Sequence, residues 1–305
     1  MDRALKIAKS FSLAFSRDSR ALATLSRDVF IWDLHSRKKK VRAHPCSNPS
    51  SACFSPNGEQ LGVKSTSGVI ALISTKDGTL IRDFNNLTDG EGSNLQFSAC
   101  GEFIVDGSWD GRILVRRALS ARIEFSAEFP GEMIAGVHCD AKGDTWVFEH
   151  HRKATSQTAS PAPCYFSVWR WPFNHGSVIL PAQVPFARTS ALTSDATRLA
   201  VVHGAPPTEL TIFDIVDGTL SAHCNIHSGG TGSALAWSPK ADFLGSVQDG
   251  KVIIYRAESL KPFRDFALAY PSDIAFSPDG RLVAIGSWES GLVLPNVIDV
   301  TPTTA

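Results

Sequence analysis

The chain has 305 residues, enough to bury a substantial core as one large all-β domain or as two ordinary domains. Thirty basic residues balance thirty acidic ones, so no field of the whole molecule attracts it to nucleic acid or to an anionic membrane. No run of about eighteen apolar residues is present, so the sequence predicts no membrane insertion.

The N-terminal stretch MDRALKIAKSFSLAF has neither the apolar segment nor the small-residue cleavage site of a secretory signal. The cysteines are scattered without paired metal-ligand spacing, at Cys46, Cys53, Cys100, Cys139, Cys164 and Cys224. We therefore expect reduced thiols and a cytoplasmic protein, with the nucleus as the alternative compartment.

A repeated unit runs along the chain: a strand that ends in Phe-Ser or a similar pair, a turn, a strand that ends in small residues, a turn and a further strand. In chain order the copies are SLAFSRDSRALATLSRD (12–28), SACFSPNGEQLGVKSTSG (51–68), SNLQFSACGEFIVDGSWDG (93–111), AGVHCDAKGDTWVFEH (135–150), SALTSDATRLAVVHG (190–204), SALAWSPKADFLGSVQDG (233–250) and SDIAFSPDGRLVAIGSWESG (272–291). Their equivalent positions are Phe15, Phe54, Phe97, Cys139, Leu192, Trp237 and Phe276.

Each unit fits a small antiparallel sheet. Ser277-Pro-Asp-Gly280 suits a tight turn, because proline presets the backbone and glycine takes the left-handed conformation. Segments such as VFIW (29–32) and KVIIY (251–255) are apolar at successive positions, so both faces of the sheet should be buried. A fourth strand follows in most units, as in GTLIRDF (78–84). Seven such sheets predict an all-β, seven-bladed β-propeller of four-stranded blades.

The last unit lacks an outer strand, since only TPTTA follows residue 300. Residues 4–9 can supply that strand, with Leu5 and Ile7 on one face, and close the ring; a helix over 4–11 is the alternative. Closure would remove two sheet edges that invite aggregation. The sequence thus predicts one propeller domain over residues 1–300 and a short polar tail over 301–305.

The units resemble the WD-repeat family. The resemblance rests on the FSPDG-like turns (276–280 and 54–58), the GSWDG turn (107–111) and the third strand FIWD (30–33). It covers residues 4–298 and implies a propeller that binds partners on the face formed by the turns between second and third strands and by the links between blades. The family's Gly-His pair is absent, and Trp-Asp ends a third strand once, so a buried His–Asp network in every blade is not expected.

Three residues mark that face as a candidate protein-binding face. Trp109 and Trp288 hold the same turn position in units three and seven, and Arg27 holds it in unit one. Tryptophan and arginine dominate interface energetics. The alternative is that each indole ring lies flat over its own blade as local cover.

Two insertions lie in equivalent turns of neighbouring units. Unit four continues past Phe148 with EHHRKATSQTASPAP, which contains His150, His151 and Arg152, and unit five carries GAPPTE (204–209) with Pro206 and Pro207. Extra loop on a rigid scaffold often carries binding function. Tolerated surface variation explains it equally well, because long loops cost little conformational entropy.

The basic run 37–42 falls between the third and fourth strands of unit one, on the opposite face. It suits a nuclear-import signal or an anionic contact, although such a run is commonly a solvated turn.

No motif indicates catalysis. The clusters Glu149-His150-His151 and His223-Cys224 with His227 lack the spacing of a four-ligand metal site. The glycine-rich GGTGS (229–233) leads into a strand, whereas a phosphate site needs the start of a helix. We therefore expect a non-catalytic scaffold without cofactor or metal, acting as a monomeric propeller within a complex with protein or peptide partners. The alternatives are a propeller enzyme, such as a lactonase-like hydrolase with its site in the central channel, and a nuclear or nucleic-acid-associated factor that uses the 37–42 turn.

Overall fold

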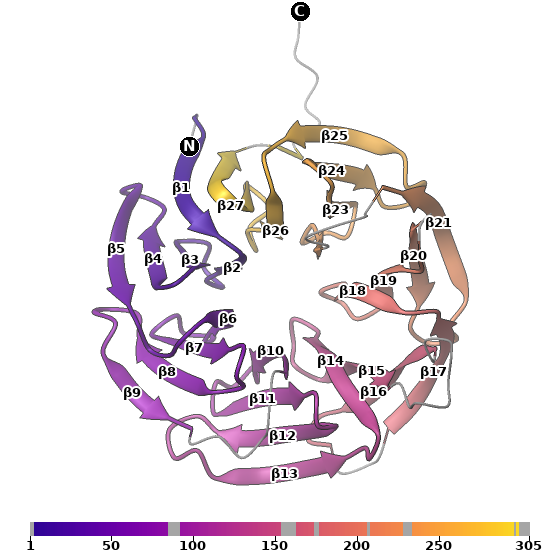
Figure 1. The fold of residues 1–305 in the computed structure, drawn as a ribbon, viewed down its shortest axis with the longest axis horizontal. Helices are drawn as coiled ribbons and strands as arrows, with labels where there is room; N and C mark the ends of the chain where they lie inside the picture. The colour runs from indigo at the N-terminus through magenta and orange to yellow at the C-terminus, as the bar shows by residue number, and fades with distance from the viewer. Residues whose placement is uncertain are drawn as a thin grey trace, which may run out of the picture.

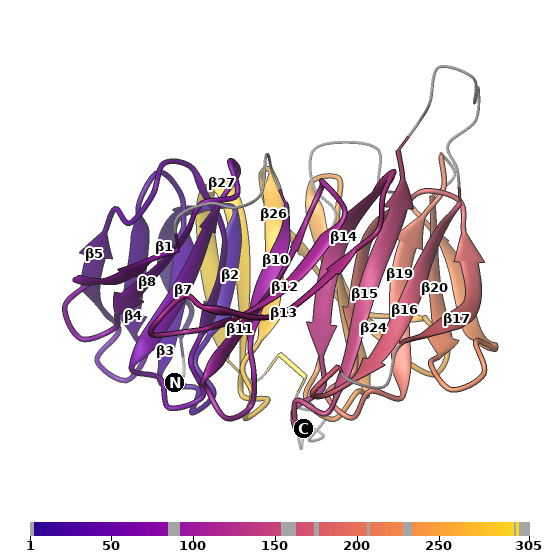
Figure 2. The same ribbon diagram turned by 90° about the horizontal axis from the view of Figure 1, so that it is seen from below.

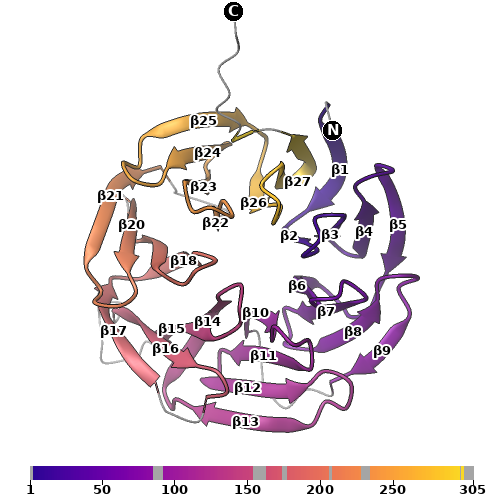
Figure 3. The ribbon, with the colours of Figure 1, turned by 180° about the vertical axis from the view of Figure 1, so that it is seen from behind.

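The computed structural model describes residues 3–84, 92–153, 163–173, 177–205, 208–227, 234–295 and 297–298. Over these residues the chain forms strands and turns without helix, and the strands build seven antiparallel sheets around a central axis (Figures 1 and 3). Within these ranges there is accordingly no helix long and apolar enough to cross a membrane.

Six blades have four strands each, ordered from the axis outward. Blades 1 to 3 consist of β2 (Ser12–Phe15), β3 (Ala21–Leu25), β4 (Val29–Asp33), β5 (Lys38–Ala43); β6 (Pro49–Phe54), β7 (Gln60–Ser65), β8 (Ile70–Ser74), β9 (Leu80–Asp83); and β10 (Gly92–Phe97), β11 (Phe103–Ser108), β12 (Arg112–Arg117), β13 (Ile123–Glu128). Blades 4 to 6 consist of β14 (Glu132–Cys139), β15 (Thr145–Arg152), β16 (Cys164–Arg170), β17 (Ser177–Val184); β18 (Ala187–Leu192), β19 (Arg198–His203), β20 (Thr208–Asp214), β21 (Leu220–Ile226); and β22 (Leu235–Trp237), β23 (Phe243–Gln248), β24 (Lys251–Arg256), β25 (Pro262–Ala267).

The seventh blade joins the two ends of the chain. Its strands are β26 (Pro271–Phe276), β27 (Leu282–Pro295) and β1 (Leu5–Ser10). The first half of β27 pairs with β26 and the second half with β1. A Cβ atom on Gly291 would lie 2.4 Å from the Ile285 carbonyl oxygen, so the two halves of β27 fold against each other and give this blade its fourth strand.

The predicted closure by the N-terminal segment is confirmed. Leu5 pairs with Val293 and Ile7 with Gly291, and both side chains are buried while Lys6 is exposed. In Figure 1 the indigo β1 lies beside the yellow β27.

The repeat of the sequence sets the register of the fold. The seven equivalent positions are the last residues of the innermost strands β2, β6, β10, β14, β18, β22 and β26. The turns that follow are as predicted: Gly58 and Gly280 have φ of 75° and 73°, the left-handed conformation that glycine adopts without strain.

The core is divided between the blades. The buried apolar side chains of the described residues form seven clusters, each between two neighbouring blades. The middle strands are buried on both faces, as in β8 and β24, because each blade is covered by its neighbours. This agrees with the successive apolar positions of those strands.

The blades have two distinct ends (Figure 2). The turns between second and third strands and the links between blades form one end, drawn uppermost in Figure 2, which we call the upper face. The other turns form the lower face.

Candidate functional site: the central channel and the upper face

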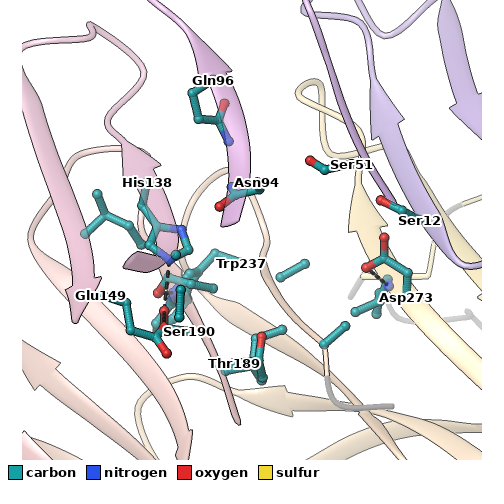
Figure 4. A pocket seen from close by; sticks show the side chains of 18 of the residues that line it. Ser12, Ser51, Asn94, Gln96, His138, Glu149, Thr189, Ser190, Trp237 and Asp273 are labelled. Carbon is teal, nitrogen blue, oxygen red and sulfur yellow. Dashed lines mark hydrogen bonds between the residues drawn. The ribbon is translucent and has the colours of Figure 1, made fainter. Parts of the chain in front are cut away.

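The innermost strands surround a cavity of about 600 Å³ in the upper part of the channel. Polar side chains enter it from six blades, and Figure 4 shows several of them facing the open centre. They include Ser12, Ser51, Asn94, Gln96, His138, Glu149, Thr189, Ser190 and Asp273. The volume lies within the range of small-molecule sites.

A hydrogen-bonded network forms the wall between blades 4 and 5. Ser190 Oγ donates to Glu149 Oε2 at 2.5 Å and lies 2.9 Å from His138 Nε2, and His151 Nε2 lies 2.5 Å from Glu149 Oε1. A Cβ on Gly136 would lie 3.0 Å from His138 Nε2 and 3.1 Å from Glu149 Oε2. The missing side chain of Gly136 therefore gives the network its room.

The environment fixes the protonation of this network. Burial alone would raise the pKa of Glu149, but hydrogen bonds from His151 and Ser190 hold that pKa below its usual value, so the carboxyl is ionised. Burial lowers the pKa of His138 despite the nearby Glu149, so the imidazole is neutral at neutral pH. Because the Ser190 proton goes to Glu149, its oxygen accepts from His138 Nε2–H, which leaves Nδ1 of His138 as an acceptor.

The opposite wall holds Asp273 (Figure 4). Its carboxylate accepts the backbone N–H groups of Leu13 and Ile274, each at 2.8 Å, and so connects blade 7 to blade 1. Burial raises the pKa of Asp273 to about 7, although these hydrogen bonds and one from Ser12 act in the opposite direction.

Because of this raised pKa, the free energy of unfolding should fall as the pH rises from about 4 to about 7. The unfolded carboxyl titrates near 3.8 and the folded one near 7, so between these values the folded state binds the proton more tightly. We expect the free energy of unfolding to decrease from pH 4 to pH 7 and the Asp273→Asn variant to show a smaller decrease. Urea denaturation of both proteins at pH 5 and pH 8 measures this difference. An equal decrease in the two proteins would contradict the assignment.

Large aromatic side chains line the lower part of the channel. A second cavity of about 660 Å³ is lined there by six of the repeat positions: Phe15, Phe54, Phe97, Cys139, Trp237 and Phe276. The large side chains of the repeat positions thus lie toward the lower face, together with polar residues such as Arg17 and Asp140, whereas the polar side chains of the innermost strands lie toward the upper face.

Exposed aromatic side chains gather on the upper face. They lie in its turns and blade links, with exposed fractions of 41% for Trp109, 47% for Phe186, 60% for Tyr270 and 42% for Trp288. The other large apolar side chains that are exposed among the described residues lie on outer strands or in lower turns; they are Leu80, Ile81, Leu119, Ile123, Val178, Ile179, Val216 and Leu220.

The structure separates the predicted binding residues into groups. The Trp288 ring packs on Phe11, at a ring-centroid distance of 4.8 Å, and Tyr270 is the next exposed aromatic residue along the same edge, since its backbone carbonyl accepts the backbone N–H of Trp288 at 3.0 Å. We call Phe11, Tyr270 and Trp288 the aromatic patch. Trp109 lies in the upper turn of blade 3, apart from this patch, and the exposed Arg27 lies in the upper turn of blade 1. Phe11 and Tyr270 were missed because they sit in links that the repeat pattern leaves open.

The residues before the insertion of unit four lie differently from the prediction. Strand β15 continues to Arg152 rather than ending near Phe148, and His150 pairs with Tyr165 in β16. His150 is fully buried, so its side chain is not part of a protein-binding face. His151 joins the channel network and Arg152 is exposed. Pro206 and Pro207, like residues 154–162 of the insertion, lie outside the described residues.

His150 belongs to a buried network in blade 4. Its Nδ1 lies 3.0 Å from Glu132 Oε2 and its Nε2 lies 2.7 Å from Ser167 Oγ, which also accepts Trp169 Nε1–H at 2.9 Å. The order Ser–His–Glu matches a nucleophilic triad. However, Ser167 and His150 are buried and Ser167 is occupied by the indole, so no substrate can reach them. The network instead stabilises the blade.

The prediction that the basic run 37–42 lies in a turn is wrong. Residues from Lys38 onward form the outer strand β5, where an exposed position tolerates charge. Several charges contact the protein itself: Arg37 Nη2 donates to the Ala4 carbonyl at 2.7 Å, Lys39 Nζ lies 4.1 Å from the Phe30 ring centroid, and Arg42 Nη2 lies 2.7 Å from Asp28 Oδ2.

Within the described ranges no three His, Cys, Asp or Glu side chains are grouped as a metal site would require. The segment GGTGS (229–233) lies outside the described residues.

Seven blades around a polar channel define the chain as a seven-bladed β-propeller. Among solved structures it is similar to a chain of Kuenenia stuttgartiensis hydrazine synthase, with a TM-score of 0.79 over 96% of this chain and 97% of that chain, at 14% sequence identity. At this identity the similarity concerns the fold alone. No protein-family model matches the sequence, and no curated protein does. The resemblance to the WD-repeat family therefore stays a prediction.

Proposed function

We propose that the chain is a non-catalytic scaffold that binds a partner protein on its upper face. The observation that carries this proposal is the placement of the exposed aromatic residues: Trp109, Phe186, Tyr270 and Trp288 all lie on one face. Large exposed aromatic side chains are the residues that anchor protein interfaces. The exposed aliphatic residues are spread over the outer strands and lower turns and form no comparable set.

The basic side chains near the aromatic residues favour a partner with acidic groups. Lys9 Nζ lies 5.5 Å from the Trp288 ring centroid, and Arg27 and Arg152 are exposed on the same face. A partner segment that combines apolar with acidic side chains fits such a surface, since charge complementarity steers association and suppresses other partners.

Blade 1 supports extending the proposal to a WD-repeat-like propeller. Trp32 Nε1 donates to Thr24 Oγ1 at 3.2 Å, and His44 Nδ1 lies 3.2 Å from Asp28 Oδ1. These contacts join the third strand to the second and the blade link to the upper turn.

The six cysteines are free thiols, consistent with the proposed cytoplasmic or nuclear location.

Truncating Tyr270 and Trp288 should strongly weaken partner binding. The wild-type chain is used to capture proteins from an extract of its own organism, beside Tyr270→Ala/Trp288→Ala and the control Leu119→Ala/Val216→Ala, which removes exposed apolar side chains from lower turns. We expect a protein that the wild type and the control retain and the patch variant loses. With that protein purified, the loss of two anchors should weaken the Kd by about 30-fold or more, the equivalent of about 2 kcal/mol.

The acidic character of the partner is tested with the wild-type chain and the purified partner protein. Added salt should weaken the wild-type complex, and Lys9→Ala should reduce that salt dependence. If the patch variant and the control bind equally, the aromatic residues are local cover and the proposal is wrong.

A further inference from the structure

The two carboxyl groups of the upper channel, Glu149 and Asp273, are satisfied by the protein itself. Glu149 accepts hydrogen bonds from Ser190 and His151, and Asp273 accepts them from two backbone N–H groups. Arg188, at the rim, donates from Nε to the Gly204 carbonyl at 3.3 Å. No cluster of unpaired like charges therefore faces the cavity from the described residues, which argues against a strongly charged ligand.

Neutral polar groups remain for a ligand. Nδ1 of His138 makes no hydrogen bond within the described part of the chain, and the same holds for the side chains of Ser51, Gln96 and Thr189. All four side chains are half-buried and come from different innermost strands (Figure 4). Hydroxyl and amide groups both donate and accept, whereas the free imidazole nitrogen accepts. A ligand that meets all of them needs several groups of the same kind.

The acceptor on His138 is held in place before a ligand arrives. The bond from Nε2 to Ser190 fixes the tautomer and the ring, and Ser190 is fixed by Glu149, whose side chain is 4% exposed. A rigid acceptor reduces the ordering cost of binding. This arrangement exceeds what is needed to connect β14 with β18, because it leaves one imidazole nitrogen without a hydrogen-bond partner among the residues that the structure describes.

We propose that the upper channel binds a small, neutral, polyhydroxylated molecule, one of whose hydroxyl groups donates a hydrogen bond to Nδ1 of His138. The site is separate from the aromatic patch, so it does not depend on the proposed scaffold function. Ser190 and Glu149 act as positioning residues, since they reach the ligand through His138.

The proposal is tested on the full chain with D-glucose and myo-inositol as neutral probes and with D-gluconate and D-glucosamine as charged counterparts. Binding is measured by calorimetry, and the ring nitrogens of His138 are followed by ¹⁵N NMR. His138→Phe keeps a ring of similar size but removes the acceptor. His223→Phe is the matched control, because His223 is exposed on the outer strand β21. Circular dichroism confirms that each variant is folded.

We expect a neutral probe to bind at millimolar concentration or below and to shift Nδ1 of His138 while Nε2 keeps its proton. His138→Phe should weaken binding by more than about tenfold, or about 1.4 kcal/mol, and His223→Phe should leave it unchanged. In Ser190→Ala the NMR spectrum should show a mixture of tautomers. The proposal is overturned if neither neutral probe binds, if a charged counterpart binds instead, or if His138→Phe binds as the wild type does.

Discussion

Replacing Asp106 with asparagine is expected to lower the free energy of unfolding by about 3–5 kcal/mol, the cost of removing one partner from a buried ion pair. Asp106 lies between blades 2 and 3 and faces two cations. Lys64 Nζ donates to Asp106 Oδ1 and to the Gly107 carbonyl, and Arg116 Nη1 lies 3.9 Å from Asp106 Oδ2. The side chains of all three residues are at most 2% exposed.

The size of the effect follows from the count of charges. Two cations share one carboxylate, and neither Nη1 nor Nη2 of Arg116 has a hydrogen-bond partner in the described residues. Burial lowers the pKa of Arg116, and Asp106 opposes that shift. Asparagine keeps the shape of the side chain but removes its charge, so both cations would be left uncompensated away from water.

Urea denaturation measures the loss, with Asp265→Asn as the control because Asp265 is exposed on the outer strand β25. The control should change stability by less than about 0.5 kcal/mol. A second variant, Lys64→Met in the Asp106→Asn background, should recover part of the loss, since it removes one uncompensated cation. A loss for Asp106→Asn no larger than that of the control would refute the argument.

The fold was predictable because its determinants are local in sequence. Each unit carries its own turn, as in Pro278-Asp279-Gly280, and its own buried strands, so the pattern repeats wherever the blade repeats. The positions Phe15 to Phe276 end the innermost strands because the same turn follows each of them. The closing strand was predictable from the one unit that lacked a fourth strand.

The channel network was not predictable, because its members meet only through blade packing. His138 and Ser190 are 52 positions apart, and Ser190 and Glu149 are 41 apart. Serine is common in these strands, and nothing in the local pattern distinguishes Ser190 from the others. Lys64 and Asp106 pose the same difficulty, since a lysine in a strand ordinarily suggests an exposed position.

The error at His150 has a specific physical cause. In a strand, adjacent side chains point to opposite faces of the sheet, so Glu149 faces the channel wall while His150 turns into blade 4. The sequence predicted that the strand ends near Phe148, because charged and polar residues follow Phe148. Glu132 and Ser167, which hold the ring of His150, lie 18 and 17 positions away and give no local signal.

Truncating the closing strand should have the other large effect. Leu5 and Ile7 pack with Leu13, Leu22 and Val293 in the cluster between blades 7 and 1. We expect Leu5→Ala/Ile7→Ala to lower the free energy of unfolding by about 4 kcal/mol or more, since each such truncation in a core costs about 2–5 kcal/mol. Lys6→Ala, on the exposed face of the same strand, should change it by less than about 0.5 kcal/mol.

Deleting residues 1–10 should be more severe, because it also opens the edge of β27. The pairs Leu5 with Val293 and Ile7 with Gly291 are lost, together with the hydrogen bond from Ser272 Oγ to the Ser10 carbonyl. An unpaired edge is a template for association between chains. We expect the truncated chain to aggregate, and a peptide of residues 1–11 added in trans to raise its unfolding midpoint with peptide concentration.

The closing strand also links stability to completion of the whole chain. Among the described residues, strand β1 pairs with residues 287–293, so the seventh blade cannot form until nearly all of the sequence is present. Contacts of such long sequence separation form late, because loop closure must precede them. The side-chain truncations Leu5→Ala/Ile7→Ala should therefore speed unfolding while leaving the folding rate nearly unchanged. Stopped-flow measurements on Leu5→Ala/Ile7→Ala decide this, and an equal slowing of folding would mean that the ring closes early.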